Sequence, residues 1–186
     1  RNSDIHSFEP VPKTFSAYLK NIQLNNSVNI IANNFGLSDA ERDEYIYFYP
    51  QGSGNASLQN LSESQTVEKI QCKFKTLDQY IAANDCSVDF LKCDVEGAEL
   101  LVFKGGKETI LKHKPIVFSE ILRKWSMKFE YNPNDIFNLF RSMGYEVYFC
   151  QDSKLLQFTE MNESTVETNF FFLHLDKHAS LIDQYS

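Results

Sequence analysis

The chain has 186 residues, a length that fits one domain with a substantial hydrophobic core. Its hydrophobic fraction of 42% and aromatic fraction of 14%, with 16 Phe and 9 Tyr, indicate a globular protein and exclude a disordered one. The formal net charge of -7, without a basic stripe, argues against nucleic acid or an anionic membrane as partner and favours small neutral or cationic ligands.

The cysteines and histidines give no sign of a metal site. The four cysteines form no CxxC pair and match no zinc pattern, so we expect reduced thiols in a cytoplasmic protein. His174 and His178 are four residues apart but lack an adjacent acid pair at helical spacing. No apolar run approaches the roughly 20 residues of a membrane span.

Hydrophobic periodicity and turn residues predict strands that alternate with amphipathic helices. The predicted strands are 5–8, 28–32, 43–50, 70–74, 88–93, 116–119, 145–150 and 167–175. The predicted helices are 13–26, one that begins near 76, one after 94 that breaks at 105–106 and resumes over 107–114, and 132–144. A loop is expected over 52–57, because "GSGNAS" is rich in turn residues.

This alternation predicts a single α/β domain, 1–186, with a mainly parallel sheet and helices on both faces. The last two strands are joined by a polar segment without a helix, which suggests an antiparallel hairpin at the C-terminal edge of the sheet.

Acids follow three of the predicted strands. Glu9 comes after 5–8, Asp94 and Glu96 after 88–93, and Glu120 after 116–119. In open parallel sheets, ligands bind beyond the carboxyl ends of the strands. One carboxylate there can accept hydrogen bonds from both hydroxyls of a ribose, and Glu9 fits this role because Pro10 restricts the turn that presents it.

Each of these acids also has a purely structural interpretation. Glu9 could be a solvated loop acid, and Asp94 could be only a helix cap. Glu96 and Glu99 would lie in the first turn of a helix, where an acid gains roughly 0.3–1 kcal/mol from the macrodipole without any function. Position alone leaves both interpretations open.

Four segments taken together resemble the FkbM family of S-adenosylmethionine-dependent methyltransferases. They are "IHSFEPVPKTFSAYLKNIQLNN", "NIIANNFGLSDAERDEYIYFYP", "KFKTLDQYIA" and "DFLKCDVEGAELLVFKGG", and they occur in the family's order over roughly residues 5–121. "LKCDVEGAE" is the most specific of these motifs. The resemblance implies a Rossmann-like class I fold and methylation of a hydroxyl, on a sugar or glycan or on a secondary metabolite.

The resemblance also implies roles for residues that would hold S-adenosylmethionine. Glu9 corresponds to the ribose-binding acid, and Asp94 lies in the acidic block beside the methionine end of the cofactor. The residues expected near the adenine are Asn34, Phe35 and Gly36. Phe35 could stack on that ring, or it could be a core residue.

Catalytic roles fall on the same acidic block. Asp94, then Glu96, then Glu120 are the candidates to orient or deprotonate the acceptor hydroxyl. Trp125 is the only Trp and could form an acceptor platform, or it could be a half-buried aromatic at the sheet edge. The expected partner is a small-molecule or glycan acceptor, and a homodimer is allowed.

One departure from the family stands out. Its first strand and glycine-containing turn, usually D-x-G-A-N, should precede "IHSFEP" and are not found here. We expect a chain truncated at its N-terminus; the alternative is a non-catalytic binding or scaffold module without a complete donor site. A nicotinamide dehydrogenase would need G-x-G-x-x-G before Ile5 and a catalytic Lys, Tyr or His at a strand end, and no good candidate is present.

Overall fold

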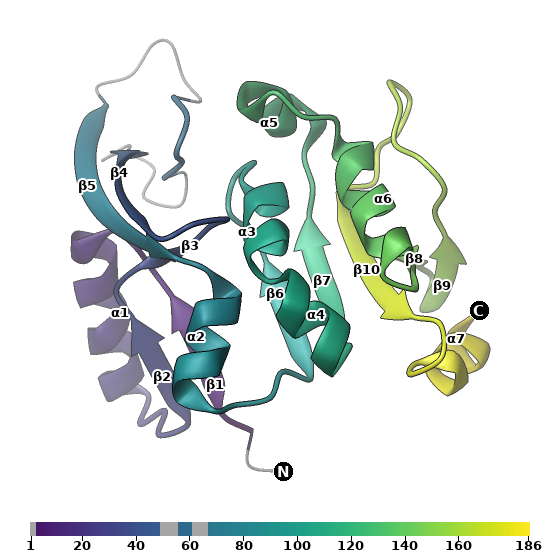
Figure 1. Cartoon of the computed structure of the whole chain (residues 1–186), viewed down its shortest axis with the longest axis horizontal. Coiled ribbons are helices and arrows are strands. Elements are labelled where there is room, and N and C mark those ends of the chain that lie inside the picture. Colours follow the sequence, from purple (N-terminus) through teal and green to yellow (C-terminus); the bar gives the residue numbers. More distant parts are fainter. Residues whose placement is uncertain (1–2, 49–55, 61–66) are drawn as a thin grey trace.

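The computed structural model describes residues 3–48, 56–60 and 67–186, so most of the loop predicted over 52–57 lies outside the described residues. Strands alternate with helices along most of the chain (Figure 1). In chain order the elements are β1 (Ile5–Phe8), α1 (Pro12–Leu24), β2 (Ile30–Asn33), β3 (Gly36–Leu37), β4 (Arg42–Phe48), β5 (Glu68–Lys75), α2 (Leu77–Asn84), β6 (Phe90–Cys93), α3 (Glu99–Gly105), α4 (Lys107–His113), β7 (Ile116–Glu120), α5 (Arg123–Ser126), the 3-10 helix η1 (Met127–Phe129), α6 (Pro133–Ser142), β8 (Tyr145–Gln151), β9 (Lys154–Gln157), β10 (Asn169–His174) and α7 (Ala179–Tyr185).

The strands form three groups with the orders β1-β2, β3-β5-β4 and β6-β7-β10-β8-β9. The pairs β1/β2, β3/β5 and β6/β7 are parallel, and the other pairs are antiparallel. Figure 1 shows β1, β2, β6 and β7 running in the same direction, so their carboxyl ends lie at the same end of the molecule. The predicted α/β class is confirmed.

The C-terminal strands are ordered differently from the simple hairpin that the sequence suggests. β10 inserts between β7 and β8 and is antiparallel to both. The polar connection contains a further strand, β9, which pairs with β8 and forms the edge of the sheet. The helix α7 was not predicted either.

Two predicted strands begin too early. Val28 was placed in the second strand, but it is 97% exposed, and the ladder with β1 starts at the pair Ile5–Ile30. Likewise β6 starts at Phe90, opposite Ile116, and not at Val88. In both places the partner strand sets where pairing begins, which a single strand's own sequence does not reveal.

Helices α1 and α2 cover opposite faces of the β1/β2 pair. The Tyr18 hydroxyl of α1 donates to Ser7 Oγ at 2.9 Å, and Nδ1 of His6 lies 2.6 Å from the Tyr80 hydroxyl of α2. Successive residues of a strand point to opposite faces, so His6 and Ser7 direct these helices to the two sides of the sheet. The prediction of helices on both faces is confirmed for this part.

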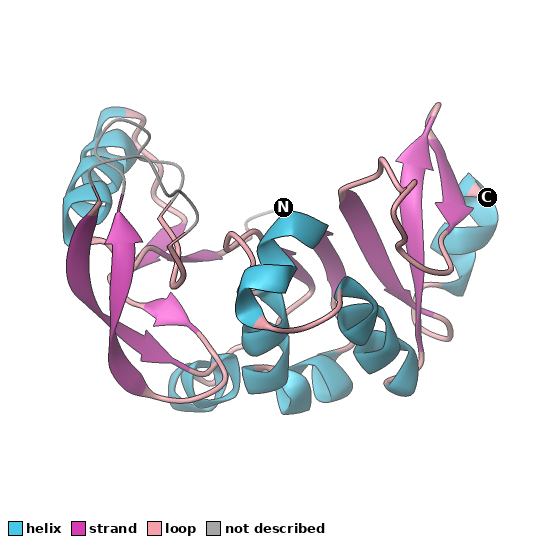
Figure 2. Ribbon diagram, turned by 90° about the horizontal axis from the view of Figure 1, so that it is seen from above, coloured by secondary structure: helices cyan, strands magenta, loops and turns pink. Residues whose placement is uncertain are grey.

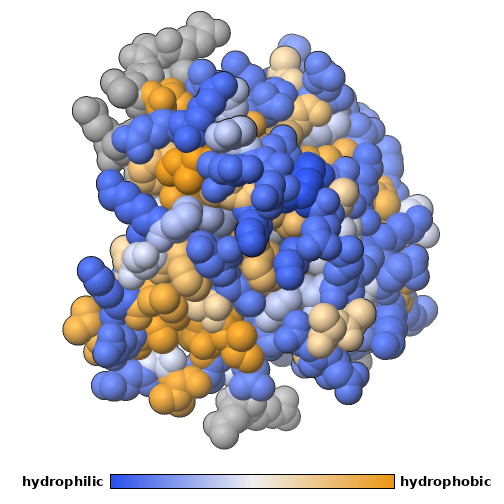
Figure 3. All heavy atoms as spheres, turned by 60° about the vertical axis from the view of Figure 1, so that its left-hand side comes forward, coloured by the Kyte–Doolittle hydropathy of each residue, from blue (hydrophilic) through white to orange (hydrophobic). Residues whose placement is uncertain are grey.

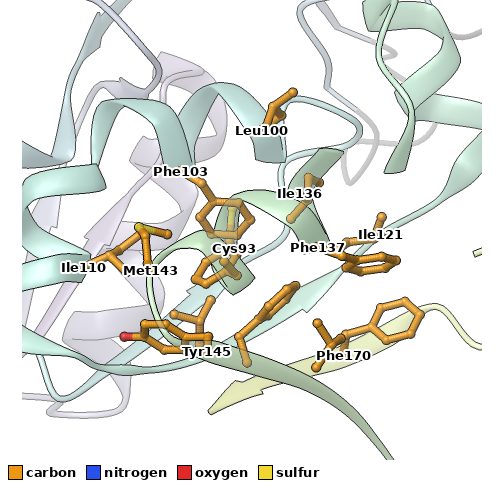
Figure 4. Close-up of a cluster of buried hydrophobic side chains, with 14 of the residues drawn as sticks. Cys93, Leu100, Phe103, Ile110, Ile121, Ile136, Phe137, Met143, Tyr145 and Phe170 are labelled. Carbon is orange, nitrogen blue, oxygen red and sulfur yellow. The ribbon is translucent and has the colours of Figure 1, made fainter. Parts of the chain in front are cut away.

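The main core lies between the five-stranded sheet and helices α3, α4 and α6, which Figure 2 shows on one side of the strands. Aromatic rings dominate it: Phe103 and Phe140 meet edge to face with centroids 4.9 Å apart. Figure 4 shows how these side chains interdigitate. Fully buried members include Phe103, Ile110, Val117, Ile121, Ile136, Phe137, Phe140, Val147, Phe170 and Phe172. On the opposite face, the half-buried Phe118 and Phe171 pair with ring centroids 4.7 Å apart.

Several strand edges are unpaired in the described part of the chain, those of β1 and β6 among them. Among the described residues, β1 pairs only with β2, and β6 pairs only with β7. Figure 3 shows apolar side chains gathered on one part of the surface. The exposed large apolar residues from β1 to β2 are Ile5, Leu19, Leu24, Val28 and Ile31. A homodimer through this or another surface stays a prediction.

All four cysteines are free thiols, of which Cys72 and Cys93 are buried and Cys150 is exposed. In the described part of the chain, no helix is long and apolar enough to cross a membrane. The cytoplasmic location stays a prediction.

Candidate functional site

The "DVEGAE" block forms a tight turn between β6 and α3. Glu96 and Gly97 both have positive φ values, 54° and 101°. A Cβ added at Gly97 would lie 2.8 Å from Cε2 of Phe129 and 3.0 Å from Cβ of Trp125. Glycine is therefore needed here twice, for its backbone conformation and for the close approach of two aromatic residues.

This turn is held from inside by Glu99, which is only 2% exposed. Its Oε1 accepts hydrogen bonds from the backbone N–H groups of Val95 and Gly97, both at 3.1 Å. The Tyr131 hydroxyl lies 3.3 Å from Oε2. Burial raises the pKa of the Glu99 carboxyl despite these donors. Glu99 thus positions the turn, a role that its place in a predicted first turn did not suggest.

The simple structural interpretations of the neighbouring acids are wrong. The N-cap of α3 is Ala98, without a side-chain hydrogen bond, so Asp94 does not cap this helix. Glu96 precedes the N-cap and is not in the first helical turn. Neither residue is explained by helix initiation, so another reason for their position is needed.

Asp94, Glu96 and Glu120 meet in one narrow pocket at the carboxyl ends of β6 and β7. The pocket is lined by Asp94, Glu96, Gly97, Glu99, Glu120, Leu122 and Trp125. Burial raises the pKa of Glu96, and the negative charges of Asp94 and Glu120 raise it further. The Lys124 ammonium and a hydrogen bond from Trp125 oppose this rise only in part. The three catalytic candidates therefore sit close enough to repel one another.

The three acids are not equivalent. Asp94 forms an exposed ion pair with Lys92, whose Nζ lies 2.8 Å from Oδ2. Glu96 forms no ion pair with any described residue and carries the raised pKa. The sequence ranks Asp94 first as base, which stays a prediction; the raised pKa and the lack of an ion pair among the described residues distinguish Glu96 from it.

Trp125 lies where an acceptor platform was expected. It is half-buried on α5, directly after β7, and its side chain lines the acidic pocket. The Lys124 ammonium lies 4.3 Å from the centroid of its ring. The Cβ of Trp125 also approaches Gly97, so Trp125 packs against the turn and lines the site.

Glu9 lies at the end of β1 and is half-buried. Its Oε1 accepts a hydrogen bond from the backbone N–H of Val11 at 2.7 Å, and burial raises its pKa. The pKa of the Cys72 thiol on β5 is raised to about 11, first by burial and then by the charge of Glu9. The second oxygen of Glu9 accepts no hydrogen bond from the described residues, so it can still accept one from a ligand.

The three residues expected near an adenine have local partners. Asn34 Nδ2 donates to the backbone oxygen of Glu9 at 2.9 Å and so ties the ends of β1 and β2 together. Phe35 packs against Phe8, with ring centroids 5.4 Å apart. Gly36 is buried against the ring of Phe74, where a Cβ would clash, so it lies in packing and not on a binding surface.

The predicted residues therefore form two groups at the same end of the molecule. Glu9, Asn34 and Phe35 follow β1 and β2, and the acidic pocket follows β6 and β7 (Figure 1). No hydrogen bond or ion pair between described side chains joins the two groups. Among the residues that the structure describes, no group of three His, Cys, Asp or Glu side chains is arranged to hold a metal ion.

Known proteins similar to this chain include two that are named as methyltransferases. Methyltransferase 1 of Beauveria bassiana (strain ARSEF 2860) is 31% identical over 121 residues, which are 55% of this chain and 49% of that protein. The chain thus spans about half the length of this curated relative. The crystal structure of methyltransferase FkbM from Methylobacillus flagellatus KT matches 91% of this chain and 36% of that one, with a TM-score of 0.54 and 14% identity.

The structural match confirms the Rossmann-like α/β fold. A family model, that of the methyltransferase FkbM domain, matches residues 2–147, a range that contains both groups of site residues. The chain belongs to the methyltransferase FkbM family.

Proposed function

We propose that this chain carries the acceptor side, and part of the donor side, of an S-adenosylmethionine-dependent O-methyltransferase. The acceptor is a hydroxyl of a sugar or glycan or of a secondary metabolite. One observation carries the proposal: Asp94, Glu96 and Glu120 converge at the ends of two adjacent parallel strands, where ligands of such sheets bind.

The residues fit one side of the cofactor. Glu9 offers a half-buried carboxylate with an oxygen free for ribose hydroxyls. The acidic pocket suits the positive charge of a sulfonium, because Asp94, Glu96 and Glu120 line it. Among the described residues, the ammonium groups of Lys92 and Lys124 offset these charges in part. When bound, S-adenosylmethionine would supply a methyl group activated by that sulfonium.

Glu96 is the proposed base. A hydroxyl is a poor nucleophile until its proton is accepted, and a carboxylate with a raised pKa accepts it more readily. Burial, and then the charges of Asp94 and Glu120, raise that pKa. Trp125 forms the wall against which the acceptor is aligned, and alignment of the reactants can supply several kcal/mol of the barrier.

One observation favours the alternative, a non-catalytic methyltransferase-like module. The open edges of β1 and β6 have no strand partner among the described residues, so the sheet is discontinuous between the two groups of site residues. Such a module would keep the acidic pocket and have no complete donor site.

Calorimetric titration with S-adenosylmethionine and S-adenosylhomocysteine, on this chain and on the complete gene product, separates the two. The first ligand carries the sulfonium charge and the second does not. Glu96→Gln should weaken the binding of S-adenosylmethionine by about tenfold, which corresponds to about 1.4 kcal/mol. It should leave the affinity for S-adenosylhomocysteine nearly unchanged. Glu9→Gln should weaken both ligands equally, because the ribose is common to them.

Asp183→Asn is the matched control, since this carboxylate is exposed on α7, away from the strand ends, and should change neither affinity. Binding by the complete gene product alone would mean that the donor site needs further residues. Absence of binding in both proteins would refute the methyltransferase proposal and support the non-catalytic module.

A further inference from the structure

A second cavity, of about 490 Å³, lies beside the acidic pocket. It is bounded by α5 and η1, by the start of α6, and by the connection between β9 and β10, all at the upper end of Figure 1. Its size is in the range of small-molecule sites. We call it the acceptor groove; its lining residues are Arg123, Met127, Glu130, Tyr131, Asn132, Pro133, Met161, Asn162 and Glu163.

The walls of the acceptor groove are fixed by hydrogen bonds. The side chain of Asn134 forms two hydrogen bonds with the backbone of Met161. Its Nδ2 donates to the Met161 carbonyl at 2.9 Å, and its Oδ1 accepts from the Met161 N–H at 2.8 Å. Arg141 donates to the carbonyls of Phe158 and Thr159 at 2.8 and 2.7 Å. The loop that forms one wall is therefore tied to α6 on both sides of the turn. A preformed groove binds a ligand without a large ordering cost.

The groove and the acidic pocket share a wall. The ring of Tyr131 lines the groove, and its hydroxyl donates to the Gly97 carbonyl at 2.9 Å, in the turn of the pocket. Arg123 and Trp125 lie on the same short helix, one lining the groove and the other lining the pocket. A molecule whose reacting hydroxyl enters the pocket would rest its remainder in the groove.

The lining combines apolar side chains with negatively charged ones. Met127, which is 68% exposed, and Met161 supply adaptable thioether surfaces beside Tyr131. Glu130 and Glu163 are exposed and form no ion pair among the described residues. Arg123 is the one cation in the lining, so carboxylates outnumber it here as they do in the adjoining pocket.

We propose that the acceptor groove binds the body of an acceptor that has an apolar surface and carries an ammonium group, which Glu130 and Glu163 recognise. This proposal rests on the proposed function, since it names the class of molecule that the same site would methylate. The overall charge of -7 agrees with a cationic ligand and disfavours an anionic one.

The chain offers a built-in probe for this groove. It has three methionines, of which Met127 and Met161 line the groove and Met143 is buried in the main core. NMR of ¹³C-methyl methionine, with signals assigned by Met127→Leu and Met161→Leu, would report groove binding and would use Met143 as internal control. The probes are n-hexylamine, n-hexanol and hexanoate, which share one apolar chain and differ in charge.

We expect the amine to shift the Met127 and Met161 signals at roughly millimolar concentration, as suits so small a ligand, and to leave Met143 unchanged. The alcohol should bind about fivefold more weakly, and hexanoate most weakly. Glu163→Gln should reduce the difference in affinity between the amine and the alcohol, whereas Arg123→Gln should increase that difference. Glu160→Gln changes the net charge equally in the same loop, does not line the groove, and should have little effect.

Equal shifts with all three probes, strongest binding of hexanoate, or no shift of either groove methionine would overturn the proposal. Its failure is distinguishable from that of the proposed function, because the groove titration needs no cofactor. Nucleoside binding without amine selectivity would refute only the groove proposal. Amine selectivity without nucleoside binding in either protein would refute only the methyl transfer.

Discussion

Substitution of Gly97 by Ala should destabilise the protein and disturb the acidic pocket together. At φ 101° an L-residue is strained, at a cost of order 1–3 kcal/mol. The new Cβ would also lie 2.8 Å from the Phe129 ring and 3.0 Å from Trp125, and overpacking of this kind costs typically 1–3 kcal/mol. Together they give about 2–6 kcal/mol, a large part of a typical stability of roughly 5–15 kcal/mol.

Urea unfolding measures this loss of stability. The fluorescence of Trp125, the only Trp in the chain, reports whether the change lies at the turn. Gly97→Ala should move the native emission, because the added methyl group pushes against the Trp125 side chain. Gly144→Ala is the control: its φ is also positive, at 84°, but its nearest neighbour is the His174 ring at 3.2 Å. The control should lose stability without a change in native emission.

The reasoning would be refuted in either of two ways. A Gly97→Ala protein as stable as wild type would show that the turn does not have the described backbone conformation. An equal loss in both variants, with unchanged emission in both, would show that Gly97 is not packed beneath Trp125.

Two further predictions concern the glutamates of the same turn. The folded-state pKa of Glu96 is raised above its unfolded value, so the wild type loses stability as pH rises from the unfolded pKa to the folded pKa. Glu96→Gln should therefore be more stable than wild type at pH near 7, and this gain should disappear near pH 4. A gain that thermal unfolding finds to be independent of pH would contradict this. Glu99→Ala leaves the N–H groups of Val95 and Gly97 without their acceptor and should cost about 2–4 kcal/mol, whereas Glu99→Gln keeps an acceptor oxygen and should cost less. Equal losses in urea unfolding would rule out the positioning role of Glu99.

The sequence predicts the acidic pocket because adjacent parallel strands place their carboxyl ends side by side. Asp94 directly follows β6 and Glu120 is the last residue of β7, and these two strands prove to be adjacent and parallel. The helix break at 105–106 was also predicted, and the structure explains it. Gly105 packs against the Ser38 carbonyl so closely that a Cβ would clash, and Gly106 lies between α3 and α4.

Long-range pairing explains what the sequence does not predict. The insertion of β10 between β7 and β8 depends on partners about 25 to 50 residues away, and the short β9 is defined only by its ladder to β8. The burial of Glu99 also depends on residues distant in the sequence, because the hydroxyl of Tyr131 lies beside its Oε2. The sequence places Glu99 in a first helical turn, where acids are usually exposed, so it does not predict that Glu99 is buried.

The turn also explains why two glutamates three residues apart have different roles. Glu99 points inward and binds the N–H groups on either side of Glu96, which fixes the positive φ of Glu96 and directs its side chain into the pocket. Once there, Glu96 is repelled by Asp94 and Glu120, and nothing in the fold requires this repulsion. A purely structural turn would gain stability by replacing Glu96 with an amide, because burial and the neighbouring charges disfavour its charged form. The carboxylate of Glu96 is therefore a cost to folding, which is the pattern expected where a site retains charge for chemistry.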